Sequence, residues 1–189
     1  LVHAINNATE IEITVSFIQP SGLALLFDPL SEALQSGATL KLLTSDYLDI
    51  THPNALRELM ALVDRGADVR IYQTHSNQSF HMKSYIFVKT NDQNEITDGC
   101  AFIGSSNISA SALTEGHEWN FRHDYTQPKT SQAAKQFLSI RTAFENIFNH
   151  EFVTHLSHEW INSYITRRKI QQLVSVNHTD TAEQVIEKN

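Results

Sequence analysis

Hydrophobic residues recur with two different periods along the first part of the chain. Residues 11–18 alternate apolar and polar side chains and are rich in β-branched types, which predicts a strand ended by Pro20. Residues 23–34 carry apolar side chains at helical spacing, and Gly37 follows them as glycine commonly does after a helix. The same features predict further elements at 39–44 (strand), 54–65 (helix) and 68–73 (strand). This alternation favours parallel strands joined by right-handed crossovers.

Beyond residue 80 the apolar runs become shorter. Residues 83–89 and 100–103 predict two strands, and the polar segment 90–99 between them is typical of a hairpin, so we expect this pair to be antiparallel. A short helix at 108–114 and a strand at 118–122 are expected next. The last predicted elements are two amphipathic helices, at 130–149 and 153–174.

Together these elements predict an α/β protein. We expect a three-layer α/β/α sandwich with a mixed, largely parallel sheet, extended by C-terminal helices. The expected organisation is one main α/β domain at 1–127, a helical extension at 128–175 that packs on it or on a partner, and a flexible tail at 176–189. A chain of 189 residues is long enough for one such well-buried domain.

Composition and charge narrow the class of protein. The formal net charge of −7 argues weakly against a dedicated non-specific nucleic-acid binder, although it is compatible with a local basic cleft. The single cysteine, Cys100, lies in an apolar run, so we expect a buried thiol in a cytoplasmic protein. The sequence has no signal peptide and no apolar run long enough to cross a bilayer, hence we expect no membrane partner.

Ten histidines raise the question of a metal site, but their spacing argues against one. The chain has neither an HExxH nor a CxxC pattern. His150, His155 and His158 fall in a stretch that reads as helical, where the last two share a face, and surface or half-buried positions explain them better. We therefore expect no metal and no cofactor.

His81 and Lys83 are the strongest candidates for chemistry. Two residues apart on a strand, their side chains point the same way, and the polar loop before them predicts a position at the rim of the sheet. A neutral imidazole can attack phosphorus and hold it as a phosphohistidine, and an ammonium can neutralise a phosphoryl oxygen. Taken alone, each residue is explained more simply as a capping histidine or a rim lysine.

A second segment, residues 104–109, adds neutral hydrogen-bond donors. Its sequence, Gly-Ser-Ser-Asn-Ile-Ser, is typical of a turn that presents backbone N–H groups to an anion. The amide of Asn107 and the hydroxyls of Ser105, Ser106 and Ser109 are candidate phosphate ligands. The alternative is that Ser106 or Asn107 caps the following helix, and the two roles are compatible.

A carboxylate completes the candidate site. Glu118 lies on the polar face of the strand predicted at 118–122. A carboxylate in this position could accept the Nδ1 proton of a catalytic imidazole, fix its tautomer and stabilise its cation. Glu115, in the loop just before the strand, is the alternative.

The three segments together resemble the phospholipase D superfamily over about residues 10–125. They are His81-Met82-Lys83, the run Phe-Ile-Gly-Ser-Ser-Asn-Ile-Ser at 102–109, and Glu118-Trp119-Asn120. The usual superfamily motif has an aspartate five residues after the lysine, where this chain has Val88. One branch instead has a glutamate downstream of the asparagine, and Glu118 matches that spacing. Within this branch the chain is most similar to the domains at the N-terminus of bacterial DEAD/DEAH-type helicases related to type III restriction subunits.

The resemblance implies a role for each candidate residue. His81 would be the nucleophile, Lys83 and Asn107 would bind phosphate, Glu118 would be the partner of His81, and no metal would be needed. Family active sites combine two such motifs, whereas this chain holds one. We therefore expect a homodimer in which one His81 attacks and its symmetry mate protonates the leaving oxygen.

Three functions follow, in order of preference. The first is a metal-independent phosphodiesterase, a DNA nuclease module of a restriction or repair helicase, with DNA, a second copy and a helicase fused at the C-terminus as partners. The second is a catalytically weak DNA-binding module of a helicase, favoured by Val88 and the acidic charge. The third is a lipid or small-phosphodiester hydrolase, because the motif recognises phosphate and not the groups attached to it.

Overall fold

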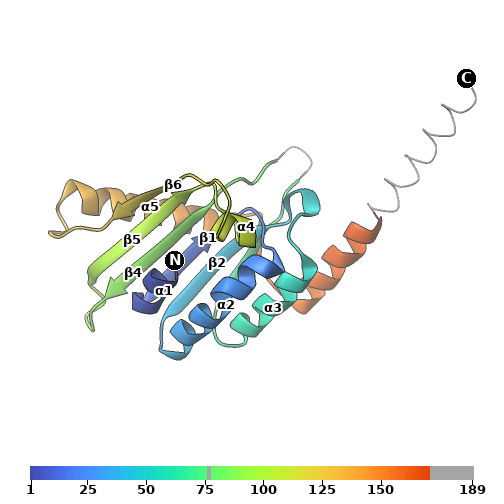
Figure 1. Ribbon diagram of the computed structural model, residues 1–189, viewed down its shortest axis with the longest axis horizontal. Coiled ribbons are helices and arrows are strands. Elements are labelled where there is room, and N and C mark those ends of the chain that lie inside the picture. The colour runs from blue at the N-terminus through green and yellow to red at the C-terminus, as the bar shows by residue number, and fades with distance from the viewer. Residues whose placement is uncertain (76–77, 171–189) are drawn as a thin grey trace, which may run out of the picture. The chain divides into compact units, whose positions relative to one another are not determined.

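The computed structural model describes residues 1–75 and 78–170 (Figure 1). The chain divides into two compact units, Leu1–Leu156 and Ser157–Asn189. In the second unit, residues 158–170 are helical. The tail predicted at 176–189 lies outside the described residues.

A seven-stranded sheet with the order β6-β5-β4-β1-β2-β3-β7 forms the centre of the first unit. The strands are β1 Glu10–Thr14, β2 Thr39–Ser45, β3 Asp68–Tyr72, β4 Ser84–Thr90, β5 Ile96–Gly104, β6 Asn120–Asp124 and β7 Val153–His155. Only the β1–β2 and β2–β3 pairings are parallel, and the pairings β1–β4, β4–β5, β5–β6 and β3–β7 are antiparallel. The sheet is mixed as predicted, but the expectation of a largely parallel sheet is wrong. The physical reason is that β4 returns beside β1 and begins an antiparallel meander.

Helices cover both faces of the sheet, which confirms the predicted three-layer sandwich (Figure 1). On one face lie α1 Val2–Asn7, α2 Pro20–Gln35 and α3 Pro53–Val63, and on the other lies α5 Gln132–Phe148. Both α2 and α3 begin with a proline, whose missing N–H would have no helical acceptor there. Each is followed by a glycine with positive φ, Gly37 at 93° and Gly66 at 99°, a conformation that other residues adopt only with strain.

The face under α5 combines an apolar cluster with buried charge. Three phenylalanines of this helix, which the sequence predicts to be amphipathic, are buried there: Phe137, Phe144 and Phe148. Arg141 of the same helix donates to the carboxylates of Glu10 and Glu12 on β1. Burial raises the pKa of the Glu12 carboxyl, and Arg141 acts in the opposite direction. Because a buried carboxylate without its partner is costly, this ion pair constrains where α5 lies on the sheet.

Three elements differ in part from the sequence-based predictions. The helix predicted at 108–114 is shorter, as α4 Ala110–Leu113, and α1 has no predicted counterpart. Residues 153–155 form the edge strand β7 where the pattern predicts the start of a helix. With only three residues, β7 is too short to show a period of its own. Because α5 and β7 pack on and extend the sheet, the predicted boundary at 127/128 falls inside the first compact unit.

The strand directions bring the predicted site segments to one edge of the sheet. The carboxyl ends of β1, β2, β3 and β5 share this edge with the amino ends of β4 and β6. His81 and Lys83 precede β4, residues 104–109 include the end of β5 and the turn after it, and Glu118 precedes β6. This is the edge at which open α/β sheets bind ligands.

Candidate active site

His81 and Lys83 lie at the rim of the sheet as predicted, in the segment that leads into β4, which begins one residue after Lys83. The residue before them, Phe80, is buried and packs its ring on Tyr72, with 4.9 Å between the centroids. This buried ring anchors a segment whose next side chain, that of His81, is exposed. Lys83 Nζ donates to the carbonyl oxygen of His81 at 2.8 Å, so the ammonium lies beside the backbone of the candidate nucleophile.

The turn after β5 approaches its neighbours closely at Gly104. The Gly104 N–H donates to the Lys83 carbonyl at 3.2 Å, and the Ser105 N–H donates to the Trp119 carbonyl at 3.0 Å. A Cβ built on Gly104 would lie 2.0 Å from that Trp119 oxygen. Glycine is therefore needed here because two backbones meet, and this contact fixes the turn against the segment before β6.

Asn107 is buried, and its side-chain amide has a defined orientation. Its Oδ1 accepts the backbone N–H groups of Ser16 at 2.9 Å and Phe17 at 3.2 Å. Its Nδ2 donates to no acceptor among the described residues, and neither do the backbone N–H groups of Ser106 and Asn107. Because two donors hold the amide oxygen, the nitrogen is left as a directed donor, as a phosphate ligand requires.

The three serine hydroxyls predicted to bind phosphate have protein partners in this structure. Ser105 Oγ donates to Glu118 Oε2, and Ser106 Oγ accepts from Asn120 Nδ2 at 2.7 Å. Ser109 Oγ accepts a backbone N–H of α4 at 3.3 Å. Ser109 is therefore the N-cap of α4, and the alternative that Ser106 or Asn107 caps this helix is wrong. The first two hydroxyls hold side chains of the β6 segment.

Glu118 lies near Lys83 and is not bonded to His81. Burial lowers the pKa of Lys83 and raises that of Tyr85, and the Glu118 carboxylate acts upward on both pKa values. Within residues 1–75 and 78–170 no hydrogen bond or ion pair joins it to His81, so the expected contact with the imidazole is not formed in this arrangement. Glu115, the alternative carboxylate, is exposed and forms no ion pair in the same part of the chain.

Burial and charge act in opposite directions on Lys83. Burial lowers the pKa of its ammonium, and the Glu118 carboxylate partly offsets that effect. Burial also raises the pKa of Tyr85, whose hydroxyl donates to the Ser106 carbonyl at 3.0 Å. Tyr85 is therefore a neutral donor whose hydroxyl holds the backbone of the turn after β5.

Three contributors to this edge are absent from the sequence-based prediction: Ser16, Ser45 and Tyr47. Ser45 Oγ donates to the Ser16 carbonyl at 2.7 Å and accepts the Tyr47 N–H at 3.3 Å. The Tyr47 ring meets His81 edge-to-face, with 5.0 Å between the centroids. Since Asn107 is bonded to Ser16, contacts run from Asn107 to His81 without a break. The signal that could have found these residues is their position just after, or at the end of, β1 and β2.

The structure explains why valine can stand at position 88, where the superfamily motif has an aspartate. Val88 is buried in the apolar cluster under α5, opposite Glu10 of β1 and Gly99 of β5. An aspartate here would bury a carboxylate among apolar side chains. The position also lies well inside β4, away from the edge that carries His81.

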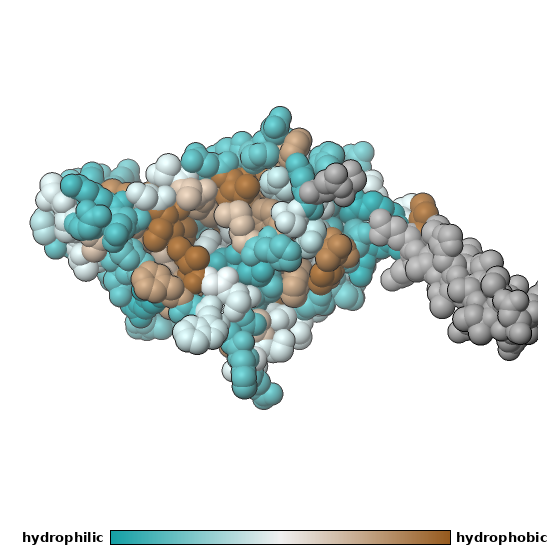
Figure 2. Space-filling view, turned by 90° about the horizontal axis from the view of Figure 1, so that it is seen from above, coloured by the Kyte–Doolittle hydropathy of each residue, from teal (hydrophilic) through white to brown (hydrophobic). Residues whose placement is uncertain are grey.

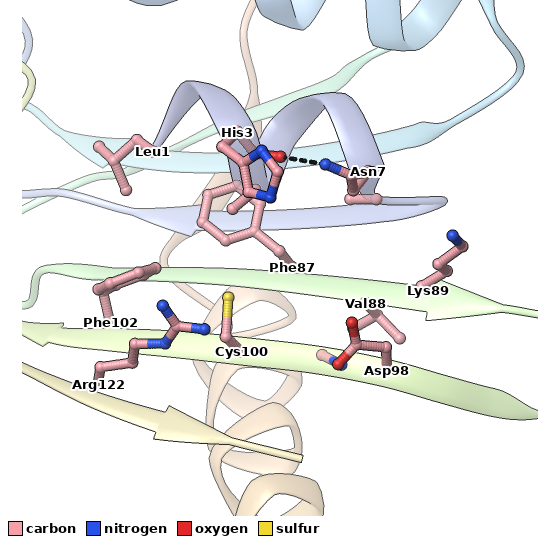
Figure 3. Close-up of a pocket in the computed structure, with 13 residues that line it drawn as sticks. Leu1, His3, Asn7, Phe87, Val88, Lys89, Asp98, Cys100, Phe102 and Arg122 are labelled. Carbon is pink, nitrogen blue, oxygen red and sulfur yellow. Dashed lines mark hydrogen bonds between the residues drawn. The ribbon is translucent and has the colours of Figure 1, made fainter. Parts of the chain in front are cut away.

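A separate pocket of about 320 Å³ lies between α1 and strands β4, β5 and β6 (Figure 3). Phe87, Cys100 and Arg122 are among the residues that line it, and the four predicted catalytic residues are not. Cys100 is buried as predicted, and burial raises the pKa of its thiol. This pocket therefore does not contribute to the candidate site.

The described part of the chain holds no group of three or more His, Cys, Asp or Glu that could bind a metal ion. His155 lies in β7, so the helix face that it was expected to share with His158 does not exist. His150 instead accepts the Phe152 N–H at 3.2 Å through Nδ1. Nor does this part contain a helix long and apolar enough to span a membrane.

The profile of a known domain family, described as cardiolipin synthase, PLD-like domain, matches residues 1–141. The chain belongs to this PLD-like family. The matched range contains His81, Lys83, Asn107 and Glu118, and membership indicates phosphodiester chemistry. The predicted superfamily is thereby confirmed, whereas the helicase-associated branch stays a prediction. No curated protein matches the sequence.

Three solved structures are similar to this PLD-like domain to different degrees. Phosphatidylserine synthase from Haemophilus influenzae Rd KW20 is 14% identical, with a TM-score of 0.59 over 86% of this chain and 39% of that one. Polyphosphate kinase from Porphyromonas gingivalis is 16% identical, with a TM-score of 0.48 over 79% and 23% of the two chains. TrmBL2, an archaeal chromatin protein, is 14% identical, with a TM-score of 0.44 over 78% and 46%. The chain spans less than half the length of each, and only the first likeness supports the fold.

The opposing effects on Lys83 give a prediction that is independent of activity. Replacing Glu118 by Gln removes the anion that raises the pKa of Lys83, so we expect that pKa to fall further below its ordinary value. Its ammonium would then lose its proton at a lower pH than in the wild type. An NMR titration of the Lys83 side-chain carbon signals measures this shift. Glu115→Gln is the control and should leave the titration unchanged, and an upward shift in Glu118→Gln would contradict the account.

Proposed function

We propose that this PLD-like domain is a metal-independent phosphodiesterase that cleaves DNA through a phosphohistidine on His81. One observation carries the proposal: a closed ring of contacts joins the candidate residues. From His81 and Lys83 it passes through the turn after β5 to Asn107. It then returns to His81 through Ser16, Ser45 and Tyr47. It supports the proposal because it gathers an imidazole, an ammonium and a directed amide donor at one edge. Those three groups suit cleavage of a phosphodiester.

The proposed reaction has two displacements at phosphorus. First, a ring nitrogen of His81 attacks phosphorus, the bond to the leaving sugar oxygen breaks, and that oxygen takes a proton from a second imidazolium. Then water attacks the phosphohistidine, its proton passes to the second imidazole, and the phosphorus–nitrogen bond breaks. His81 is regenerated, and each step needs one nucleophile and one acid or base.

Lys83 and Asn107 have distinct roles in this reaction. The Lys83 ammonium neutralises negative charge on the non-bridging phosphoryl oxygens, and the Asn107 amide nitrogen donates to the same group. Burial of Lys83 strengthens its attraction for an anion, because less water screens the charge. Glu118 partly offsets the accompanying fall in pKa.

We further propose that the second imidazole belongs to a second copy of the chain in a homodimer. Exposed apolar side chains flank the site, and we call the group the edge patch: Met82, Ile103, Trp119 and Phe121. Trp119 is 89% exposed and Phe121 is 66% exposed, which is unusual for such large side chains beside one another. Figure 2 looks onto this side of the molecule and shows hydrophobic residues, in brown, gathered beside polar ones, in teal.

The position of the edge patch favours a second copy as its occupant. Ile103 and Phe121 are opposite one another on β5 and β6, and β6 is the last strand of the sheet on that side. Met82 lies between His81 and Lys83 in sequence. A two-fold contact over this patch would therefore bring two copies of the site together and also cover the open edge of β6.

DNA as the substrate, and a helicase as the attached protein, rest on the resemblance to helicase-associated domains through the spacing of Glu118. The phosphate-binding groups recognise the phosphodiester and not the molecule that carries it. The assays below therefore include DNA, a small phosphodiester and a lipid.

Cleavage of plasmid DNA in the presence of EDTA tests the phosphodiesterase proposal. We expect the wild type to cleave and His81→Ala to be slower by at least about 1,000-fold, because the nucleophile is missing. Asn107→Asp keeps an oxygen that accepts the Ser16 and Phe17 N–H groups but replaces the donor by an anionic oxygen. It should therefore keep the fold by circular dichroism and lose most of the activity.

His117→Ala is the matched control, since His117 is an exposed histidine next to Glu118, and it should keep the wild-type rate. Bis(p-nitrophenyl) phosphate and cardiolipin vesicles, assayed in parallel, distinguish the substrate classes. Hydrolysis of the lipid alone would show that the substrate is a lipid and not DNA. DNA binding without cleavage of any substrate would indicate a binding module and overturn the proposal, and loss of activity in EDTA would overturn metal independence.

Analytical ultracentrifugation tests the homodimer. We expect a dimer for the wild type and a monomer for the Trp119→Ser/Phe121→Ser double variant, with cleavage lost in parallel because the second imidazole is no longer supplied. Leu25→Ser removes an exposed leucine from α2 and should leave both sedimentation and cleavage unchanged. A wild-type protein that sediments as a monomer and cleaves at its full rate would rule out the shared site.

A further inference from the structure

Among the described residues, the ring of His81 forms one aromatic ring contact, with the ring of Tyr47. The two rings meet edge-to-face, with 5.0 Å between centroids and 74° between planes. No hydrogen bond to a His81 ring nitrogen occurs among the described residues. An imidazole that must attack phosphorus needs a defined direction, and here the aromatic contact is the interaction that can supply it.

Tyr47 is itself firmly held. Its N–H donates to Ser45 Oγ at 3.3 Å, and its ring packs on the apolar cluster under α5. The next two residues, Leu48 and Asp49, both have positive φ, of 53° and 52°, which is uncommon for residues other than glycine. Thr51 Oγ1 closes the loop by donating to the Ser45 carbonyl at 2.8 Å. The loop therefore stores backbone strain while it holds one aromatic side chain against the site.

The segment between β3 and β4, which carries His81, also contacts this loop near its start, at Thr74. Asp46 Oδ1, next to Tyr47, accepts both the backbone N–H of Thr74 at 2.7 Å and its hydroxyl at 2.8 Å. Phe80 is buried directly before His81. The loop after β2 thus contacts the segment between β3 and β4 at both Thr74 and His81.

We propose that Tyr47 is the positioning residue of His81, the aromatic side chain that orients the imidazole for attack on phosphorus. The inference rests on the proposed function of His81 as nucleophile. Glu118, which the sequence pattern assigns to this task, hydrogen-bonds Ser105 and acts on Lys83 in this structure. The ring contact, and not the tyrosine hydroxyl, carries the role, so phenylalanine should replace Tyr47.

Steady-state kinetics of Tyr47→Leu and Tyr47→Phe test the proposal. For Tyr47→Leu we expect kcat to fall by about 10- to 100-fold with KM within about twofold, because phosphate binding by Lys83 and Asn107 is unchanged while the attack is misdirected. Tyr47→Phe should stay within about threefold of the wild type, since it keeps the ring contact. Leu48→Ala, at the exposed neighbouring position, is the control and should keep the wild-type kcat.

NMR signals of the His81 imidazole provide a readout that does not depend on activity. In Tyr47→Leu these signals should move, because the ring current of Tyr47 is removed, and in Tyr47→Phe they should stay close to the wild type. Unchanged signals in Tyr47→Leu, or an equal loss of kcat in both Tyr47 variants, would overturn the inference. A wild type that hydrolyses no phosphodiester would defeat the proposed function, while the NMR comparison would still decide whether the contact exists.

Discussion

The bond between the Asn107 side chain and the loop after β1 is the interaction on which the site depends. Asn107 Oδ1 accepts two consecutive backbone N–H groups, of Ser16 and Phe17, across a separation of about ninety residues in sequence. Those N–H groups are buried or half-buried, so losing their acceptor would cost about 1–3 kcal/mol for each. The amide therefore joins the turn after β5 to the loop after β1, and its orientation leaves the nitrogen as a donor. The Asn107 oxygen thus holds the structure together, while its nitrogen is directed for phosphate binding.

The contacts that begin at Asn107 extend around the site in both directions. On one side they pass through Ser16 and Ser45 to Tyr47 and the His81 ring. On the other side they pass through the turn after β5 to Lys83, whose ammonium returns to the backbone of His81. Several of these contacts involve backbone atoms at or next to the strand ends, so the sheet positions the loops that carry the candidate residues.

Burial and charge at this edge act on the pKa of Lys83 in opposite directions. Its partial burial disfavours the ammonium, and Glu118 acts in the opposite direction. Glu118 is in turn held by Ser105, whose neighbour Gly104 allows the β5 turn to touch the segment before β6. In this structure the Glu118 carboxylate thus acts on Lys83, and His81 contacts the ring of Tyr47.

Much of the fold could be predicted from the sequence, because α2, α3 and strands β1 to β5 each show a clear period and an end signal such as Gly37 or Gly66. The proportion of antiparallel pairing could not, because strand direction depends on where β4 joins the sheet and not on any local pattern. His81, Lys83, Asn107 and Glu118 were found through residue type and spacing. Tyr47 and Ser16 were missed because their importance comes from the strand order, which places β1 directly beside β4 and β2 directly beside β1. For the same reason the partner of Glu118 could not be read from the chain.

The central claim is that His81 becomes covalently attached to phosphorus. The most direct measurement is a single-turnover reaction of excess protein with a labelled oligonucleotide, quenched in alkali, in which phosphohistidine survives, and followed by mass spectrometry of the proteolysed protein. The account predicts a nucleotide adduct on the peptide that contains His81, formed and consumed at the rate of cleavage. An adduct on another residue, or cleavage at the full rate by His81→Ala, would contradict it.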